Sequence, residues 1–97
     1  MTSVYRVELR GSGFRLSLEG RNGVYGFVTE RLVRAASPDA ATKEAVRSVL
    51  DRPTVRAQVG AEGTTAAVQV GAVVECPAGV QPPDVQPGLS WFEESGH

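Results

Sequence analysis

Side chains that commonly carry out catalysis are scarce in this sequence of 97 residues. Its only histidine, His97, is the last residue, and its only cysteine, Cys76, stands directly before a proline. A Ser-His or Cys-His pair would therefore depend on the end of the chain, and no disulfide can form within one chain. The carboxylates are scattered, without the spacing of a metal site or a glycosidase pair. We therefore expect a non-enzymatic protein with no cofactor and no metal.

Long hydrophobic runs are also missing. The longest apolar stretch, 66–74, is interrupted by Gln69 and is too short to cross a bilayer. The first ten residues alternate polar and apolar side chains and lack the apolar core of a signal peptide. Together with the single cysteine, this predicts a cytoplasmic protein without membrane contact, and the arginine-rich, lysine-poor composition is typical of a GC-rich bacterial genome.

Basic side chains are absent from the C-terminal part of the chain. Residues 60–97 carry five acidic groups and no lysine or arginine, whereas residues 1–36 carry six arginines and three glutamates. This asymmetry favours contact between the two ends of one chain, with head-to-tail pairing of two copies as the alternative. The formal net charge is only -1, so no overall field attracts nucleic acid or an anionic membrane.

What the sequence does contain is strand-like alternation. Hydrophobic residues make up 41% of the chain, enough for one small domain with one core. Residues 5–10 and 14–18 alternate apolar and polar side chains, and Gly11-Ser12 between them fits a two-residue hairpin turn. In that hairpin Leu9 faces Phe14. A phosphate-binding loop would have to lead into a helix, but an alternating stretch follows and Leu16 stands where the third glycine would be.

A second hairpin is predicted at Asn22-Gly23, the strongest short turn signal in the chain. Pairing Arg21 with Val24 then places Arg15 between Glu8 and Glu30 in a ladder of charges across three strands.

The third predicted strand, residues 24–36, does not fit a simple two-sided pattern. The same register puts Thr29 and Arg31 on the apolar face and leaves Val24, Val28 and Leu32 on the polar face. Either a bulge near residues 29–31 reverses the phase, or the strand is apolar on both sides.

A helix is predicted after these strands. Ser37 is its N-cap, Pro38 takes the first helical position and Pro53 ends it. One apolar stripe faces the core, made of Ala41, Ala45, Val46, Val49 and Leu50. Residues 54–60 fit a strand or a short helical turn.

The last part of the chain is predicted to be a long strand, an irregular connection and a short docking strand. From 65 to 76, one face carries Ala66, Val68, Val70, Ala72, Val74 and Cys76. Residues 77–88 hold four of the six prolines and form an extended connection. Residues 89–92 are too hydrophobic for a free tail, so we expect an edge strand there, with 93–97 frayed.

These elements predict the α+β class: an antiparallel sheet of four to six strands in the order β-β-β-α-β-β, with one helix packed on one face. Residues 1–76 are predicted to form the single domain, 77–88 the connection, and 89–97 the docking segment with a frayed end.

A contact surface is the functional feature that the pattern indicates most strongly. One helix cannot cover an apolar row on the polar face of the sheet, and such a row commonly marks a protein interface. We expect self-association or binding to a partner protein. The alternative is that the row is core. The candidate interface residues are Val24, Val28, Leu32, Arg31, Thr29 and Trp91.

Two other functions are weighed against this one. Nucleic acid could bind the arginine-rich hairpins, but glutamates interleave with those arginines and the aromatic residues fall on the opposite face. A small ligand could bind between the helix and the segment around Trp91.

Overall fold

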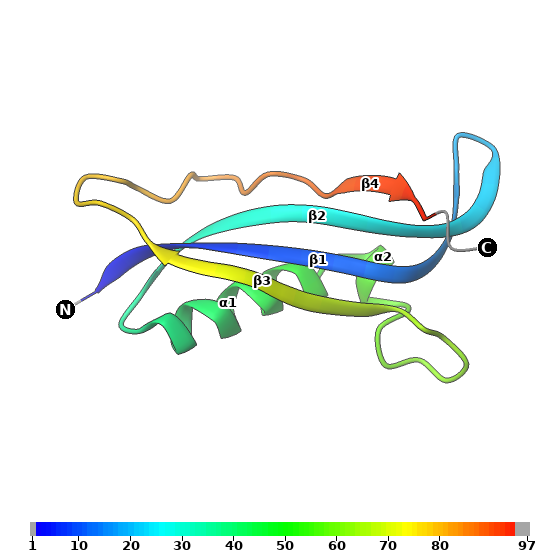
Figure 1. Cartoon of the computed structure of the whole chain (residues 1–97), viewed down its shortest axis with the longest axis horizontal. Helices are drawn as coiled ribbons and strands as arrows, with labels where there is room; N and C mark the ends of the chain where they lie inside the picture. The colour runs from blue at the N-terminus through cyan, green and yellow to red at the C-terminus, as the bar shows by residue number, and fades with distance from the viewer. Residues whose placement is uncertain (1, 95–97) are drawn as a thin grey trace.

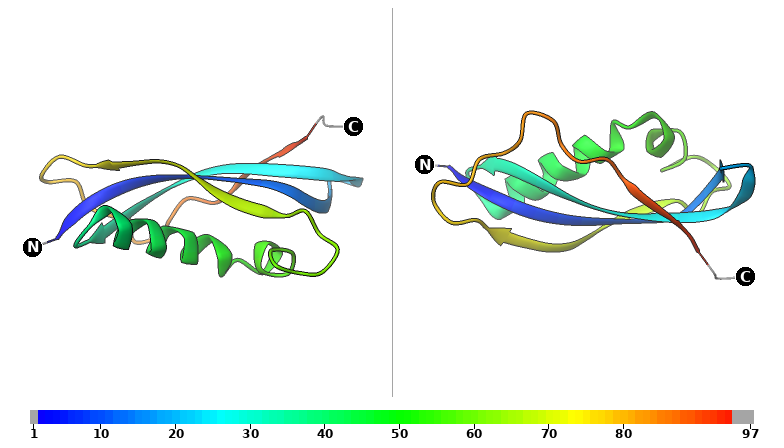
Figure 2. Two further views of the ribbon diagram at one scale, coloured as in Figure 1. Left: turned by 60° about the horizontal axis from the view of Figure 1, so that its bottom comes forward. Right: turned by 90° about the horizontal axis from the view of Figure 1, so that it is seen from above.

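The computed structural model describes residues 2–94. In chain order they form β1 (Ser3–Leu18), β2 (Arg21–Ala35), α1 (Pro38–Leu50), α2 (Pro53–Arg56), β3 (Ala67–Glu75) and β4 (Ser90–Glu93). Four antiparallel strands make one open sheet in the order β3-β1-β2-β4, and α1 lies along one face (Figure 1, Figure 2). The predicted α+β class, one helix on an antiparallel sheet, is confirmed.

The predicted hairpin at Gly11-Ser12 is wrong, because β1 is one strand of 16 residues. Its register against β2 shifts between Gly11 and Phe14, which makes the glycine segment a β-bulge within the strand. A bulge shifts the alternation of apolar and polar side chains by one residue, as a turn does. The shift between residues 9 and 14 in the sequence is therefore compatible with either. The continuous pairing of β1 with the 15 residues of β2 takes the place of two short hairpins.

Both bulge glycines are required by close packing. A Cβ built on Gly11 would lie 1.9 Å from Phe27 Cε2. Gly13 has φ +74, and a Cβ there would lie 2.3 Å from the Thr65 carbonyl oxygen. The segment is neither a turn nor the loop before a helix that phosphate binding would need.

The hairpin turn lies at Glu19-Gly20, not at Asn22-Gly23. Both turn residues have positive φ, 53 and 78, as a two-residue primed turn requires. Asn22 and Gly23 are part of β2, where they pair with Ser17 and Leu16. In this register Phe14 lies opposite Tyr25, so the aromatic side chains meet after the bulge.

The predicted charge ladder is wrong for the same reason. Arg15 lies opposite Val24, and Glu8 lies opposite Glu30. Glu30 instead has Arg6 beside it, at 3.9 Å between Oε2 and Nε, with both side chains largely exposed.

Strand β2 is apolar on both faces, the second of the two predicted alternatives. Its register against β1 is continuous from residue 27 to residue 35, so no bulge lies at 29–31. Phe27 and Val33 are buried on the face of the sheet that carries α1, while Val24 and Val28 are exposed on the opposite face.

Helix α1 forms as predicted. The Ser37 side chain accepts a hydrogen bond from the Ala40 N–H at 3.1 Å, and Ala41, Ala45 and Val49 are buried. The small alanines let the helix pack closely on β1, β2 and β3. For residues 54–60 the helical alternative is the observed one, because α2 forms there and buries Val55.

Strand β3 departs from the single predicted apolar face. Its register against β1 shifts between Val70 and Val73, so two residues of β3 lie opposite Glu8. Ala66 and Val68 pack against the core as predicted, but after the bulge Val73 takes over that role. Val74 is 46% exposed.

The C-terminal segment docks as an edge strand, as predicted. Residues 77–88 contain no helix or strand, and β4 then pairs antiparallel with β2. The predicted fraying is wrong for Glu93 and Glu94: Glu93 belongs to β4, and the Glu94 N–H donates to the Val24 carbonyl at 2.8 Å. Residues 95–97 of the same prediction lie outside the described residues. The division of the chain at 76 and 88 stays a prediction.

Candidate protein-interaction surface

An apolar row lies on the face of the sheet that α1 does not cover. Val24 and Val28 are 42% and 45% exposed there, and Leu32 is half-buried on the same side of β2. The core face of β2 is filled by Tyr25, Phe27 and other buried side chains, so the fold buries a complete core without these residues.

Phe92 belongs to this row and was not singled out in the sequence. It pairs with Gly26, between Val24 and Val28, and a Cβ built on Gly26 would lie 2.8 Å from Phe92 Cζ. Its side chain therefore covers the glycine on the outer face and is 47% exposed. The signal was strand alternation: once Trp91 faces the core, Phe92 must face outward. We call these four residues the outer row: Val24, Val28, Leu32 and Phe92.

The other predicted interface residues lie elsewhere. Trp91 turns to the core face, where its ring centroid lies 5.5 Å from that of Phe14 and 5.1 Å from that of Phe27. Thr29 and Arg31 alternate with the outer row along β2 and face the helix side. The structure therefore brings three of the six predicted residues together on one surface.

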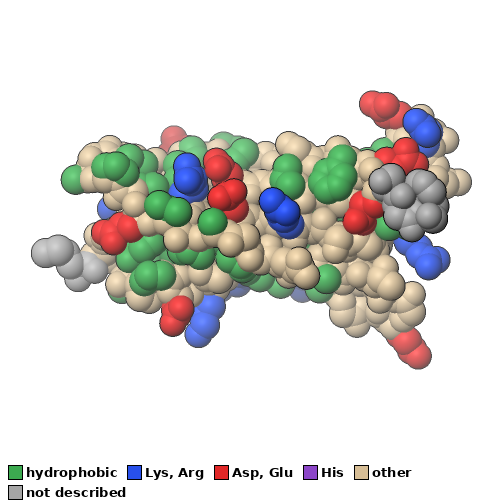
Figure 3. Space-filling view, viewed as in Figure 1, with side chains coloured by type: hydrophobic (Ala, Val, Ile, Leu, Met, Phe, Trp, Pro, Cys, Tyr) green, Lys and Arg blue, Asp and Glu red, His purple; other side chains and the backbone are tan. Residues whose placement is uncertain are grey.

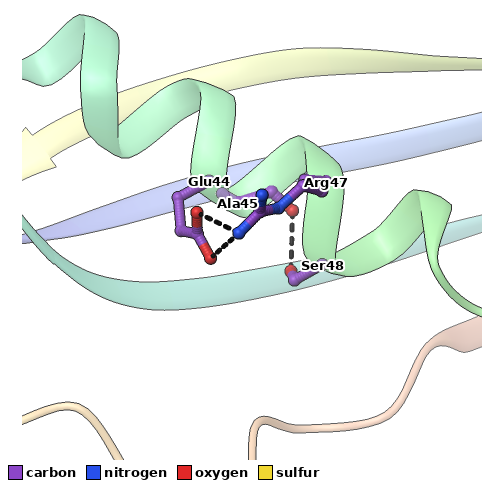
Figure 4. A network of polar contacts seen from close by, with 4 residues as sticks. All are labelled: Glu44, Ala45, Arg47 and Ser48. Carbon is purple, nitrogen blue, oxygen red and sulfur yellow. Dashed lines mark hydrogen bonds and ion pairs between the residues drawn. The ribbon is translucent and has the colours of Figure 1, made fainter.

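Arg31 is buried, with 1% of its surface exposed. Its Nε donates to Ser48 Oγ of α1 at 3.1 Å, and its Nη1 donates to Thr29 Oγ1 and to the Pro87 carbonyl. The Ser48 hydroxyl donates its own proton to the Ala45 carbonyl at 2.7 Å (Figure 4). Its oxygen is thereby free to accept from Arg31 Nε. This arginine thus joins β2, α1 and the C-terminal connection.

No carboxylate pairs with Arg31 among residues 2–94. Desolvation by burial, and then the positive charge of Arg52, lower the pKa of its guanidinium. Arg52 Nη2 donates to the same Pro87 carbonyl, at 3.3 Å. Arg31 and Arg52 therefore hold the C-terminal connection at the Pro87 carbonyl, and we call this arrangement the clamp. The buried Arg31 is not part of an exposed interface.

The charges of the outer face are mixed. Arg6, Arg10 and Arg34 alternate there with Glu8 and Glu30, and Figure 3 shows acidic and basic side chains spread among apolar ones on this face. Glu8, Arg10 and Glu30 line a depression next to Val28.

For nucleic-acid binding and small-ligand binding, the two alternative functions, the structure brings together fewer of the residues that would be needed. The aromatic side chains Tyr5, Phe14 and Phe27 are buried on the face opposite the exposed arginines. Near Trp91, where a ligand was predicted, the rings of Phe14, Phe27 and Trp91 pack against one another.

Neither a metal-binding cluster nor a helix fit to span a membrane is found in the part of the chain that the structure describes. Residues 2–94 contain no group of three or more His, Cys, Asp or Glu side chains placed to hold an ion. Within the same residues, no helix has the length and apolar character needed to span a bilayer.

Comparison with known proteins gives no relative: no protein-family model, no curated protein and no solved structure matches this chain.

Proposed function

We propose that this chain is a small non-enzymatic protein that acts by protein–protein association through the outer row. The observation that carries the proposal is that Val24, Val28 and Phe92 are exposed side by side on a sheet face without a covering helix. A contiguous apolar group of this kind commonly marks a contact surface, whereas single exposed apolar residues do not.

A second copy of the chain is the partner that the charges favour. The outer face carries Arg6, Arg10 and Arg34 together with Glu8 and Glu30, so it presents both signs. A surface of one sign would repel its own copy, while a mixed surface can place acidic groups against basic ones. A homodimer in the bacterial cytoplasm is the corresponding biological proposal.

The test is Val28→Glu, followed by molar mass from light scattering on a sizing column. Burying a carboxylate in an apolar contact is unfavourable, so we expect the molar mass of the associated form to halve. Because Val28 is 45% exposed in the single chain, the melting temperature of the variant should stay within about 3 °C.

Val85→Glu is the matched control, because Val85 is 83% exposed in the connection and lies outside the outer row. It adds the same charge and should leave the molar mass unchanged. Equal masses for the unmodified chain and Val28→Glu would contradict association through this row. Fluorescence polarisation with oligonucleotides at low salt, and a thermal-shift screen of small molecules, would then test the two alternative functions.

A further inference from the structure

Exposed strand edges in this sheet are capped by glutamine side chains. At Leu32 of β2, the Gln86 amide accepts from the backbone N–H at 3.3 Å and donates to the carbonyl at 2.9 Å. At Arg15 of β1, Gln58 makes the same pair of bonds, both at 2.8 Å. Each side-chain amide thus makes the two backbone hydrogen bonds that a neighbouring strand would make, at a position where the sheet has no such strand.

The outer edge of β3 has no such cap. β3 is the terminal strand of the sheet, paired with β1 alone. Among residues 2–94, no side chain or loop makes a hydrogen bond to the backbone of 67–75 from the open side. Unpaired N–H and C=O groups in a row are a template for another strand.

The groups that point outward follow from the register. The Cys76 N–H donates to the Val4 carbonyl at 2.8 Å, so the backbone of Cys76 faces β1. Along an antiparallel pair, the backbone N–H and C=O groups of successive residues point alternately toward the partner strand and away from it. The backbone groups of Val74 therefore also point toward β1, while those of Glu75 and Val73 point toward the open side. Beyond the bulge, Val70 lies opposite Leu9. By the same alternation along β1, the backbone groups of Leu9 point toward β2, so those of Val70 point toward the open side.

The composition of β3 offers little protection against pairing. Edge strands are commonly blocked by lysine, proline or several charges, but β3 contains only one charged residue, Glu75, at its end. Its bulge at 71–72 twists the edge locally and leaves a pairing segment on each side. An antiparallel copy centred on the strand would keep the two Glu75 side chains far apart.

We propose that the outer edge of β3 pairs antiparallel with β3 of a second copy, which joins two four-stranded sheets into one. The two-fold axis of such a pair is perpendicular to the sheet, so both α1 helices lie on one side and both outer rows on the other. This contact uses a different surface from the outer row and goes beyond the proposed function. A chain that uses both contacts forms an assembly larger than a dimer.

The first experiment is amide hydrogen exchange of the unmodified full chain, read residue by residue by NMR at low and high protein concentration. In a paired edge, the amides of Val70, Val73 and Glu75 should slow by at least about tenfold as the concentration rises. The Val74 amide bonds to β1 in either state and should be protected at both concentrations. Outward amides that stay fast at the highest concentration would overturn the edge pairing.

The second experiment is Val70→Pro, with molar mass as the readout. Proline removes an outward N–H and blocks a new strand without breaking a bond to β1, so the molar mass should halve. Val85→Pro in the exposed connection is the matched control and should leave the mass unchanged.

The two proposals fail separately. A mass halved by Val28→Glu but not by Val70→Pro would support the outer row and overturn the edge contact. The reverse result would support the edge contact and contradict the outer row. If Val70→Pro does not fold, the concentration dependence of amide hydrogen exchange at Val70, Val73 and Glu75 in the unmodified chain still tests the edge contact.

Discussion

Arg31 is the residue on which three parts of the structure converge. Its guanidinium donates to Ser48 of α1, to Thr29 of β2 and to the Pro87 carbonyl. Burial and the nearby Arg52 lower its pKa, so the folded state disfavours the charge. That cost applies at any pH below the folded-state pKa and is relieved only when the group loses its proton, in strongly alkaline solution. Hydrogen bonds from the guanidinium to Ser48, Thr29 and the backbone carbonyls of Glu30 and Pro87 offset this cost.

Arg31→Lys tests this clamp. A lysine ammonium is a compact group and cannot reproduce the planar fork that reaches all three partners, so buried acceptors lose their donor. We expect the free energy of unfolding to fall by roughly 1–3 kcal/mol, measured by urea unfolding. Arg52→Lys, which removes one 3.3 Å bond at a partly exposed position, should change it by less than about 0.5 kcal/mol. Equal effects of the two variants would contradict the clamp.

At the scale of the elements, the sheet is completed by side chains where strands are missing. Gln86 closes the edge of β2 beyond the end of β4, and Gln58 closes the edge of β1 beyond the end of β3. Because these amides come from irregular segments, they also fix the positions of those segments against the sheet.

Gln86→Ala is expected to expose the Leu32 backbone. The loss of two hydrogen bonds at a partly buried edge should lower the free energy of unfolding by about 1 kcal/mol and speed exchange of the Leu32 amide. The control is Gln81→Ala, because among residues 2–94 the Gln81 side chain bonds only to the exposed Arg34 side chain, at 2.8 Å. Unchanged exchange at Leu32 in Gln86→Ala would show that the cap is not formed in solution.

At the scale of the whole molecule, the acidic C-terminal part lies against the arginine-rich N-terminal part of the same chain. Glu93 pairs with Arg21 at 3.4 Å, and Glu94 accepts a hydrogen bond from the Gly13 N–H at 2.7 Å. Trp91 completes this closure through edge-to-face contacts with the rings of Phe14 and Phe27. One ion pair and one hydrogen bond to a backbone N–H thus join acidic C-terminal residues to the N-terminal part of the same chain, the kind of contact that the sequence favoured.

Adjacent aromatic residues of β4 give a matched pair for testing this closure. Trp91→Ala removes a ring from the aromatic cluster and should lower the free energy of unfolding by about 2–4 kcal/mol, followed by circular dichroism in urea. Phe92→Ala removes an outward ring and should cost less than about 1 kcal/mol, although it belongs to the outer row. A larger loss for Phe92→Ala would contradict the assignment of faces.

The fold class, helix α1 with its Ser37 cap and the docking of the C-terminal strand were predicted from local patterns in the sequence. For β2, those patterns left two alternatives open, a bulge at 29–31 or a strand that is apolar on both faces. The second alternative is the observed one although the predicted turn was wrong. Next to the turn, moving it by three positions shifts each pairing by six residues, an even number, so the side chains of β2 keep their faces. Local signals are sufficient for such features, since capping and alternation act over a few residues.

Four features depend on contacts between distant segments and could not be predicted from local signals: the bulge at Gly11–Gly13, the bulge in β3, the burial of Arg31 and the glutamine caps. A reversal of alternation looks the same in a bulge and in a hairpin, and the choice depends on which distant strand lies alongside. Arg31 and Gln86 likewise find partners 56 and 54 residues away in the sequence. Such contacts form only after the sheet has set the positions of these segments.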